Sequence, residues 1–271
     1  MVSSVRVEFA QLPPPEQSAD RIFVTANAVI VLDGATAFVP VEVSAQAYAD
    51  HLGRQIADRL TAAPEADLRA TLAAAITDTA ARLQLRAGES PWSTVAILRE
   101  GPAALDALVL GDSTVRWGTN PGAGNGWVAD HRLAALPIPH RERYRRRLRA
   151  GTGYDQRHSE LLRELQTWQR RYRNTTRGYW IAETEPLAAY QAVVTAVPHA
   201  RWAVLATDGA LGPLTHLGGR SWSDIAALDA SGLHLLLEHC HAWERDQDPN
   251  GRRLPRAKRH DDKTLAAVSF D

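Results

Sequence analysis

The stretch Ala28–Gly34 reads AVIVLDG, five apolar residues that end abruptly at an aspartate and a glycine. A continuous apolar run rich in β-branched residues is typical of a strand buried on both faces. The same arrangement recurs in AVLATDG at 203–209 and LVLGDS at 108–113, and in reverse order in HDDKTLAAV at 260–268. Each of these strands therefore has an acidic residue at one end: Asp33, Asp208, Asp112 and the pair Asp261 and Asp262.

These acidic residues have a plain alternative explanation, because aspartate and glycine are common in turns. Four such acidic positions, each beside an apolar strand, favour a common functional site over four unrelated turns. Rigid strand ends can bring several carboxylates to one point, where they repel one another unless cations lie between them. Mg²⁺ and Mn²⁺ prefer oxygen ligands, so the pattern predicts an all-oxygen metal site rather than a zinc site.

Composition narrows the class of protein. The 271 residues carry a formal net charge of zero, 45% are hydrophobic and 23% are charged, which is typical of a globular chain with a substantial core. The single cysteine, Cys240, excludes a disulfide framework and a cysteine-based zinc site. The N-terminus lacks the apolar run of a signal peptide, and no stretch approaches the ~20 apolar residues of a membrane span, so we expect a cytoplasmic protein.

The order of the predicted elements indicates an α+β fold. Helices are predicted at 43–60, 64–85, 185–197, 221–228 and 232–245, and a long basic helical region at 141–173. Strands are predicted at both ends of the chain and in the middle, without strict β-α-β alternation. The pattern favours a layered α+β sandwich over a doubly wound sheet. We expect one domain over 1–271 with a basic helical insertion at about 138–177.

Taken in order, the motifs SADR, VIVLDGAT, STVAIL, LVLGDS, VLATDGAL and HDDKTLAAV resemble the metal-dependent protein phosphatases of type 2C, in particular the bacterial Ser/Thr branch. The resemblance covers nearly the whole chain. It implies a four-layer α/β/β/α sandwich with two antiparallel-rich sheets flanked by helical pairs, and metals in a cleft at one end.

The resemblance also implies roles for individual residues. Asp33 corresponds to a carboxylate that bridges two metals, and Gly34 to a backbone carbonyl ligand. Asp208 and Asp261 correspond to ligands of the first metal. Asp20 corresponds to an acid that orients a water, which makes Asp20, Asp33, Asp208 and Asp261 the candidate catalytic residues. Asp112 corresponds to the ligand of a third, weaker metal.

The chain departs from the family pattern in three places. Ala19 stands where the family usually has a glutamate, which weakens the second metal. The usual DGHGG or DGMGG becomes DGATAF, with Thr36 and Phe38 in place of glycines. The arginine that usually grips phosphate is missing near the N-terminus, and Arg173 and Arg177 are the candidates to replace it.

The resemblance implies a phosphatase that hydrolyses phosphoserine and phosphothreonine monoesters through a metal-activated water. The expected cofactors are two Mn²⁺ or Mg²⁺ ions, the second bound weakly, and the expected partner is a phosphorylated protein. Two alternatives stay open: a degenerate, non-catalytic binding or regulatory module, and a small-molecule phosphatase. Membrane association is not expected, and nucleic acid is the least favoured partner.

Two further features have open interpretations. The basic stretch GRRLPRAKR at 251–259 either balances the charge of the acidic site beside it or is an ordinary surface loop. Cys240, between His239 and His241, is interpreted as a half-buried helix residue rather than a metal ligand, and His260 as a loop histidine. The basic region at 141–173 is interpreted first as a solvated helical face and second as a phosphate-attracting rim.

Overall fold

The computed structural model describes residues 5–35, 41–101, 104–119, 125–197 and 200–270. Within them, ten strands form two five-stranded sheets in which every neighbouring pair is antiparallel. In chain order the strands are β1 (Val5–Leu12), β2 (Arg21–Val24), β3 (Ala28–Leu32), β4 (Val95–Glu100), β5 (Leu105–Leu110), β6 (Thr114–Gly118), β7 (Gly126–Ala129), β8 (Val193–Val197), β9 (Trp202–Ala206) and β10 (Lys263–Phe270).

The helices, named over the same residues, are α1 (Ala45–Ala62), α2 (Leu68–Arg82), α3 (Arg132–Ala135), α4 (Pro139–Arg149), α5 (Gln156–Arg170), α6 (Leu187–Tyr190), α7 (Asp208–Leu217), α8 (Trp222–Ala226) and α9 (Ala230–Asp246). No helix among these is long and apolar enough to cross a membrane.

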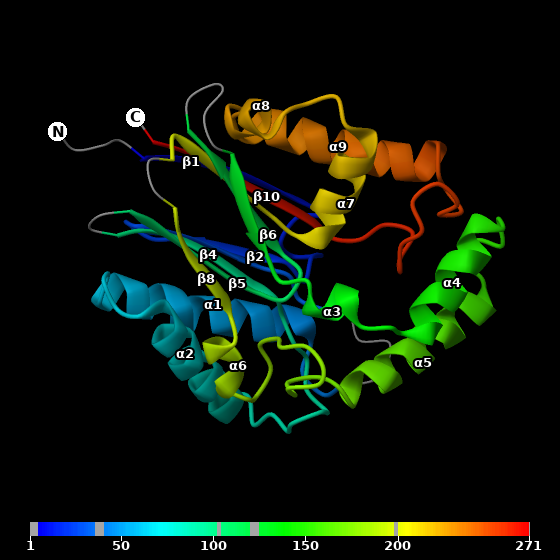
Figure 1. Ribbon diagram of the computed structural model, residues 1–271, viewed down its shortest axis with the longest axis horizontal. Helices are drawn as coiled ribbons and strands as arrows, with labels where there is room; N and C mark the ends of the chain where they lie inside the picture. The colour runs from blue at the N-terminus through cyan, green and yellow to red at the C-terminus, as the bar shows by residue number, and fades with distance from the viewer. Residues whose placement is uncertain (1–4, 36–40, 102–103, 120–124, 198–199, 271) are drawn as a thin grey trace.

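The two sheets pack face to face between layers of helices, as Figure 1 shows. One sheet has the order β2-β3-β4-β5-β8, and α1 and α2 cover its outer face. The other has the order β1-β10-β9-β6-β7, and α7, α8 and α9 cover its outer face. The predicted four-layer α/β/β/α sandwich is confirmed.

Alternation of side chains along β3 explains why its apolar run is continuous. Ile30 and Leu32 pack against α1 and α2, whereas Val29 and Val31 face the second sheet. All five residues of β3 are buried, because both faces of this sheet are covered. A strand in this position needs apolar side chains at every residue.

One sequence prediction needs correction. The helix predicted over 185–197 is instead the short α6 followed by strand β8, whose sequence VVTAV is rich in β-branched residues that favour a strand. The basic region at 141–173 is mostly helical, as predicted, and consists of α4 and α5, which are separated where Gly151 and Gly153 adopt positive φ angles of 86° and 68°.

Helices α4 and α5 lie beside the sandwich rather than on either sheet (Figure 1). They pack on each other through a cluster of their own that includes Tyr144, Leu148, Leu161 and Leu165. His158 of α5 contacts the carbonyl of Ala257 through its Nε2 at 2.7 Å. This contact joins the helical pair to the segment that leads into β10.

Candidate metal centre

The predicted aspartates come together at one end of the sandwich. Strands β3 and β5 are both antiparallel to β4, so Asp33 and Asp112, which follow them, lie at the same edge of one sheet. Asp208 follows β9 and Asp261 precedes β10, its antiparallel neighbour, so both lie at one edge of the other sheet. All four line one cleft of about 290 Å³.

Backbone contacts hold Asp33 in place and leave its carboxylate to the cleft. The Asp33 N–H donates to Thr94 Oγ1 at 3.2 Å. The Asp33 carbonyl accepts from the Thr94 N–H at 2.9 Å and from Ser93 Oγ at 3.0 Å. Both partners lie at the start of β4, so the sheet itself sets the position of this aspartate.

Close backbone contacts require glycine beside two of the aspartates. A Cβ at Gly34 would lie 2.5 Å from the carbonyl oxygen of Ala19, and a Cβ at Gly209 would lie 2.0 Å from the carbonyl oxygen of Asp262. Both distances are shorter than any side chain tolerates. The glycine of each DG pair therefore allows two chain segments to meet at the end of the sandwich.

Asp208 is the first residue of α7 and not part of a turn, which was the alternative explanation of its strand-end position. An aspartate in the first turn of a helix lies near the positive end of the helix dipole. The side chain still faces the cleft, where it meets the other carboxylates.

The carboxylates interact strongly with one another. Loss of hydration raises the pKa of Asp33 well above its usual value, and the charges of Asp20, Asp208, Asp261 and Asp112 raise it further. Loss of hydration also raises the pKa of Asp208 to about 8, with contributions from Asp112 and Asp261, while a hydrogen bond with Asp33 offsets part of the rise. The negative charges are therefore crowded and only partly balanced.

Asp20 lies behind the cleft wall and is fully buried. Its Oδ2 accepts hydrogen bonds from Thr264 Oγ1 at 2.8 Å and Thr207 Oγ1 at 3.1 Å, whereas its Oδ1 has no hydrogen-bond partner. Burial raises the pKa of Asp20 to about 7, and the nearby Asp262 and Asp261 add to the effect. A buried carboxylate oxygen without a partner is a position where a cation or an ordered water fits.

Three cationic side chains line the same cleft: Lys258, Arg141 and Arg145. Lys258 Nζ lies 2.5 Å from Asp261 Oδ1. Loss of hydration acts to lower the pKa of Lys258, but Asp261, Asp33 and Asp262 outweigh it and raise the pKa above its usual value. Lys258 belongs to the basic stretch at 251–259, so that part of the sequence balances charge in the acidic site.

The two arginines differ in their freedom to move. Both terminal nitrogens of Arg141 donate to backbone carbonyls, those of Ala134 at 3.1 Å and Leu133 at 2.8 Å. Arg145 lies 3.8 Å from Glu142 and also interacts with the hydroxyl of Tyr144, and its side chain is 39% exposed. Arg145 is therefore the cation in this cleft with the least constrained head group.

The chemistry of these donors fits a hard divalent cation. The cleft offers several carboxylates and no histidine or cysteine among its described lining residues. In the part of the chain that the structure describes, no three of these aspartates bring oxygens within 4.8 Å of one another. Ions that retain several waters tolerate such spacing, and their charge would draw the carboxylates inward.

Arg173 does not lie at the cleft, contrary to the sequence prediction. Its Nη1 forms an ion pair with Glu183 Oε1 at 2.8 Å, and both side chains are at most 5% exposed. Its guanidinium lies over the ring of Trp92, 3.7 Å from the centroid. Arg177 is exposed and is absent from the described cleft lining. Neither arginine is placed to grip a phosphate there.

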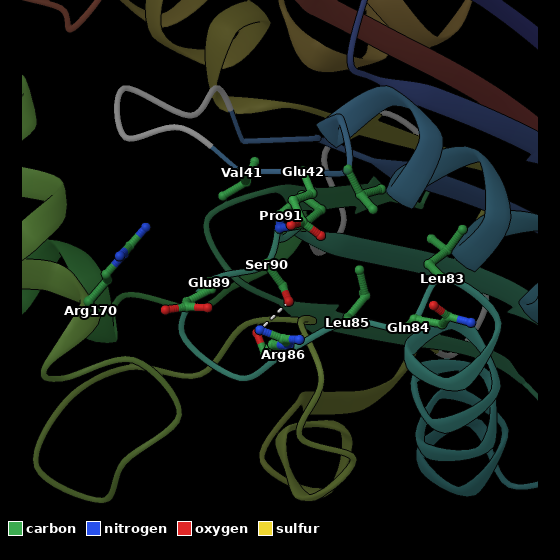
Figure 2. Close-up of a pocket in the computed structure, with 11 residues that line it drawn as sticks. Val41, Glu42, Leu83, Gln84, Leu85, Arg86, Glu89, Ser90, Pro91 and Arg170 are labelled. Carbon is green, nitrogen blue, oxygen red and sulfur yellow. Dashed lines mark hydrogen bonds between the residues drawn. The ribbon is translucent and has the colours of Figure 1, made fainter.

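Other predicted positions lie around the site. Gly34 is buried beside Ala19, and Thr36 and Phe38 fall outside the described residues. Glu42, an acidic residue that follows the DGATAF sequence, lines a different pocket of about 350 Å³ together with Pro91 and Arg170 (Figure 2). The sequence did not single out Arg145 from the other arginines of α4, because its position over the cleft depends on how that helix packs.

No protein-family model and no curated protein sequence matches the chain. Among solved structures, it is similar to PppA, described as a key regulatory component of T6SS in Pseudomonas aeruginosa, with 16% identity and a TM-score of 0.57 over 100% of this chain and 99% of that one. It is also similar to the PPM Ser-Thr phosphatase MsPP from Mycobacterium smegmatis in complex with cacodylate, with 14% identity and a TM-score of 0.55 over 98% and 97% of the two chains.

A third similar structure is the catalytic domain of the serine threonine protein phosphatase PstP in complex with two manganese ions. It has 15% identity and a TM-score of 0.52, over 98% of this chain and 99% of that one. Likeness at these identities establishes the fold. The chain therefore has the fold of the PPM Ser/Thr phosphatases.

Proposed function

We propose that this protein is a divalent-metal-dependent phosphatase that hydrolyses phosphoserine and phosphothreonine monoesters. One observation carries the proposal: strand ends from both sheets bring Asp33, Asp112, Asp208 and Asp261 into a single cleft, where burial and their mutual repulsion raise the pKa of Asp33 and Asp208. A fold does not need this crowding, which raises carboxylate pKa values and costs stability. A bound cation relieves it.

In this proposal Asp33, Asp208, Asp261 and the Gly34 carbonyl hold two Mn²⁺ or Mg²⁺ ions, and Asp112 holds a weaker third. When bound, such ions lower the pKa of a water and offset negative charge on the phosphate. Asp20 accepts hydrogen bonds from two threonines through one oxygen, and its second oxygen, which has no hydrogen-bond partner, is available to orient a water.

Arg145 takes the phosphate-binding role that the sequence analysis gave to Arg173 and Arg177. It lines the cleft with Asp208 and Asp261, and its weak pair with Glu142 leaves the guanidinium able to turn. A planar guanidinium matches two phosphate oxygens at once. We propose that the segment at about 138–177 is a basic insertion in a single domain over 1–271. Helix α4 of this insertion carries Arg145 and brings its guanidinium to the substrate.

The second metal would bind weakly. The Ala19 N–H donates to Asp262 Oδ2 at 2.7 Å, and Ala19 lies directly against Gly34. A glutamate at this position would reach toward the Gly34 carbonyl, whereas alanine offers no ligand. Because ligand charge tunes the affinity of hard cations over orders of magnitude, activity should need millimolar-scale metal. Ala19→Glu should lower the metal concentration required, which Mn²⁺ titration of activity and calorimetry can measure.

A second candidate, a degenerate regulatory module, is favoured by one contact. The ammonium of Lys258 lies on Asp261, where the first cation would otherwise draw the carboxylate. With Lys258 on Asp261, and with alanine in place of a carboxylate ligand at position 19, the cleft would hold the ammonium of Lys258 and no metal. The similar PppA is described as a regulatory component, which is consistent with such a role.

The substrate we propose is a phosphorylated protein, and the compartment is the cytoplasm. The fold likeness to Ser/Thr phosphatases supports the first. The single, buried Cys240 supports a reducing compartment, because no disulfide within the chain is possible.

Hydrolysis assays separate these candidates. We expect p-nitrophenyl phosphate and a phosphoserine peptide to be hydrolysed with Mn²⁺ and not with EDTA, and Asp208→Asn to reduce the rate by at least about 100-fold. Asp246→Asn, at an exposed aspartate of α9, is the matched control and should retain activity. No metal-dependent hydrolysis by the folded protein would support the regulatory module, and activity on small phosphates alone would support a small-molecule phosphatase.

A further inference from the structure

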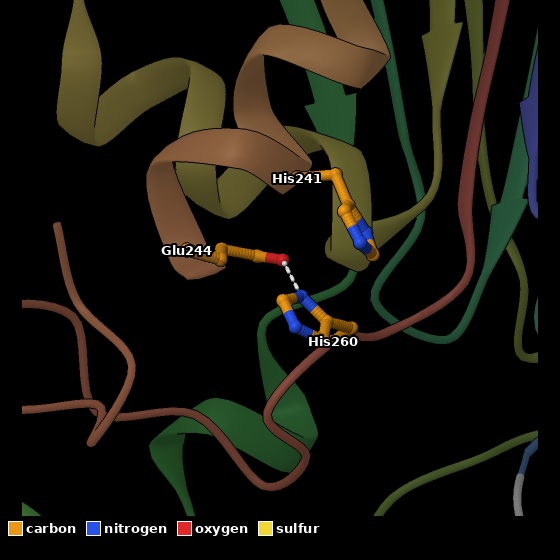
Figure 3. A group of neighbouring side chains, drawn as sticks. All are labelled: His241, Glu244 and His260. Carbon is orange, nitrogen blue, oxygen red and sulfur yellow. Dashed lines mark hydrogen bonds and ion pairs between the residues drawn. The ribbon is translucent and has the colours of Figure 1, made fainter. Parts of the chain in front are cut away.

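A second group of possible metal ligands lies outside the aspartate cleft. His241 and Glu244 occupy neighbouring positions on one face at the C-terminal end of α9, and His260 lies just before β10. Figure 3 shows the Glu244 carboxylate directed at the ring of His260, with the ring of His241 beside it. In the part of the chain that the structure describes, this is the group of three in which one ligand atom from each residue lies within 4.8 Å of the others.

The internal distances are close to those of a coordination shell. His260 Nδ1 lies 3.0 Å from Glu244 Oε2, and the rings of His241 and His260 stack with centroids 4.0 Å apart at 24°. Zinc–nitrogen and zinc–oxygen bonds of ~2.0–2.2 Å at a tetrahedral angle put two ligand atoms about 3.3 Å apart. A metal would therefore enter between His260 and Glu244 with a small opening of that pair and a turn of the stacked rings, because an imidazole nitrogen binds a metal in the plane of its ring.

The surroundings hold the glutamate side chain in place. Glu244 is 1% exposed, and its Oε2 also accepts from Lys263 Nζ at 2.8 Å, while Arg256 Nε lies 3.7 Å from its Oε1. Lys263 Nζ also donates to the carbonyl of Asp261 at 2.9 Å. A ligating carboxylate oriented by a neighbouring donor is the usual arrangement behind a metal ligand.

The same surroundings select the kind of metal. Lys263 and Arg256 weaken the attraction for any cation, so a hard ion such as Mg²⁺, which depends on carboxylate charge, gains little here. Imidazole nitrogens bind Zn²⁺ strongly as neutral ligands.

The neighbouring Cys240 does not take part. Its side chain is fully buried in the core under α9, with Leu233 and Leu237. Burial raises the pKa of its thiol to about 11, so it stays protonated. The expectation that Cys240 is a helix residue is confirmed.

We propose that His241, Glu244 and His260 form a site for Zn²⁺ or a similar borderline transition metal, with water as the remaining ligand. Such an ion would tether the end of α9 to the segment that carries Lys258 and Asp261. The site draws on different residues and a different metal class from the aspartate cleft, so it stands or falls independently of the proposed phosphatase function.

The test is Zn²⁺ binding to the full-length, metal-free protein by calorimetry, with Co²⁺ absorption as a second probe. We expect one tight Zn²⁺ per chain and the visible bands of tetrahedral Co²⁺. His241→Phe, which keeps a stacked ring but removes a ligand, should weaken Zn²⁺ binding at least tenfold and remove those bands. His239→Ala, at an exposed histidine of the same helix, should leave both unchanged.

Asp208→Asn distinguishes this site from the aspartate cleft and should not alter the tight Zn²⁺ binding. Loss of that binding in Asp208→Asn would overturn the proposal, because the ion would then lie in the cleft. Binding unaffected by His241→Phe, or no Zn²⁺ binding at all, would also overturn it and leave the three residues as a hydrogen-bonded network. Circular dichroism of each variant checks that a negative result comes from a folded protein.

Discussion

The aspartate cleft and the Arg173–Glu183 pair both contain charged side chains below the surface. The two regions differ in whether a neighbouring opposite charge compensates each of them. Glu183 faces Arg173 at 2.8 Å, accepts from the Gly88 N–H at 3.2 Å, and is closed off with Arg173 under Trp92. Asp33 and Asp208 chiefly meet other carboxylates, and Lys258 contacts Asp261 rather than either of them. One region is balanced within the protein, whereas the other is not.

This difference distinguishes buried charged residues that stabilise the fold from buried charged residues that bind a ligand. A buried ion pair carries its own counter-charge, so removing one partner leaves the other charge uncompensated and is expensive. A group of like charges that is left unbalanced lowers stability and persists where a ligand supplies the missing charge. Four predictions follow from this contrast.

The largest effect should come from breaking the balanced pair. Arg173→Met leaves Glu183 buried without its cation, and we expect the free energy of unfolding to fall by about 3–5 kcal/mol. Chemical denaturation measures it. Adding Glu183→Gln, which keeps an acceptor for Gly88 and removes the charge, should recover much of the loss. If Arg173→Met alone costs less than about 1 kcal/mol, the pair is not balanced in the way the contrast requires.

The second effect is a pH dependence of the metal-free protein. Asp20 has a folded pKa of about 7, above the usual value of 3.8, so the folded state binds more protons than the unfolded chain between these values. Its contribution therefore lowers stability as pH rises through this window. We expect about 2 kcal/mol of added stability on going from pH 7.5 to 5.5 in EDTA. Asp20→Asn should flatten this part of the profile, and an unchanged slope would contradict the assignment.

A third prediction has the opposite sign to the first. Asp33→Asn removes one charge from the crowded cleft, so in EDTA at pH 8 the variant should be more stable than the unmodified protein by about 1 kcal/mol. Denaturant titration in EDTA measures the gain, and Asp246→Asn on the exposed face of α9 serves as the control. A loss of stability in Asp33→Asn would mean that the cleft is already balanced by Lys258 and the arginines.

The smallest effect is expected at Arg177. This arginine is exposed and lies away from the cleft lining, so Arg177→Ala should change stability by less than about 0.5 kcal/mol and leave KM unchanged. Arg145→Ala, by contrast, should raise KM for a phosphorylated peptide. Steady-state kinetics of the two variants at fixed Mn²⁺ tests this pair, and equal effects would remove the special role of Arg145.

The recurring pattern of a buried strand next to an aspartate was readable from sequence because it is local. The apolar run of β3 and the carboxylate after it are adjacent in the chain, and alternation along strands makes their burial predictable. The helix predicted over 185–197 was wrong, because Glu185–Tyr190 and the β-branched stretch that becomes β8 were taken as one periodic segment. Helix and strand periods are hard to separate over such short runs.

The sequence by itself determined the layered fold and the carboxylates at its strand ends, since these depend on hydrophobic periodicity and on turn residues next to one another. Only the tertiary structure decided which charges are balanced. It paired Arg173 with Glu183, ten residues away, placed Lys258 on Asp261, and set Arg145 over the cleft. It also brought His241 and Glu244 of α9 to His260. The electrostatic state of a group depends on burial and on all charges within several ångströms, and residues distant in sequence supply many of them.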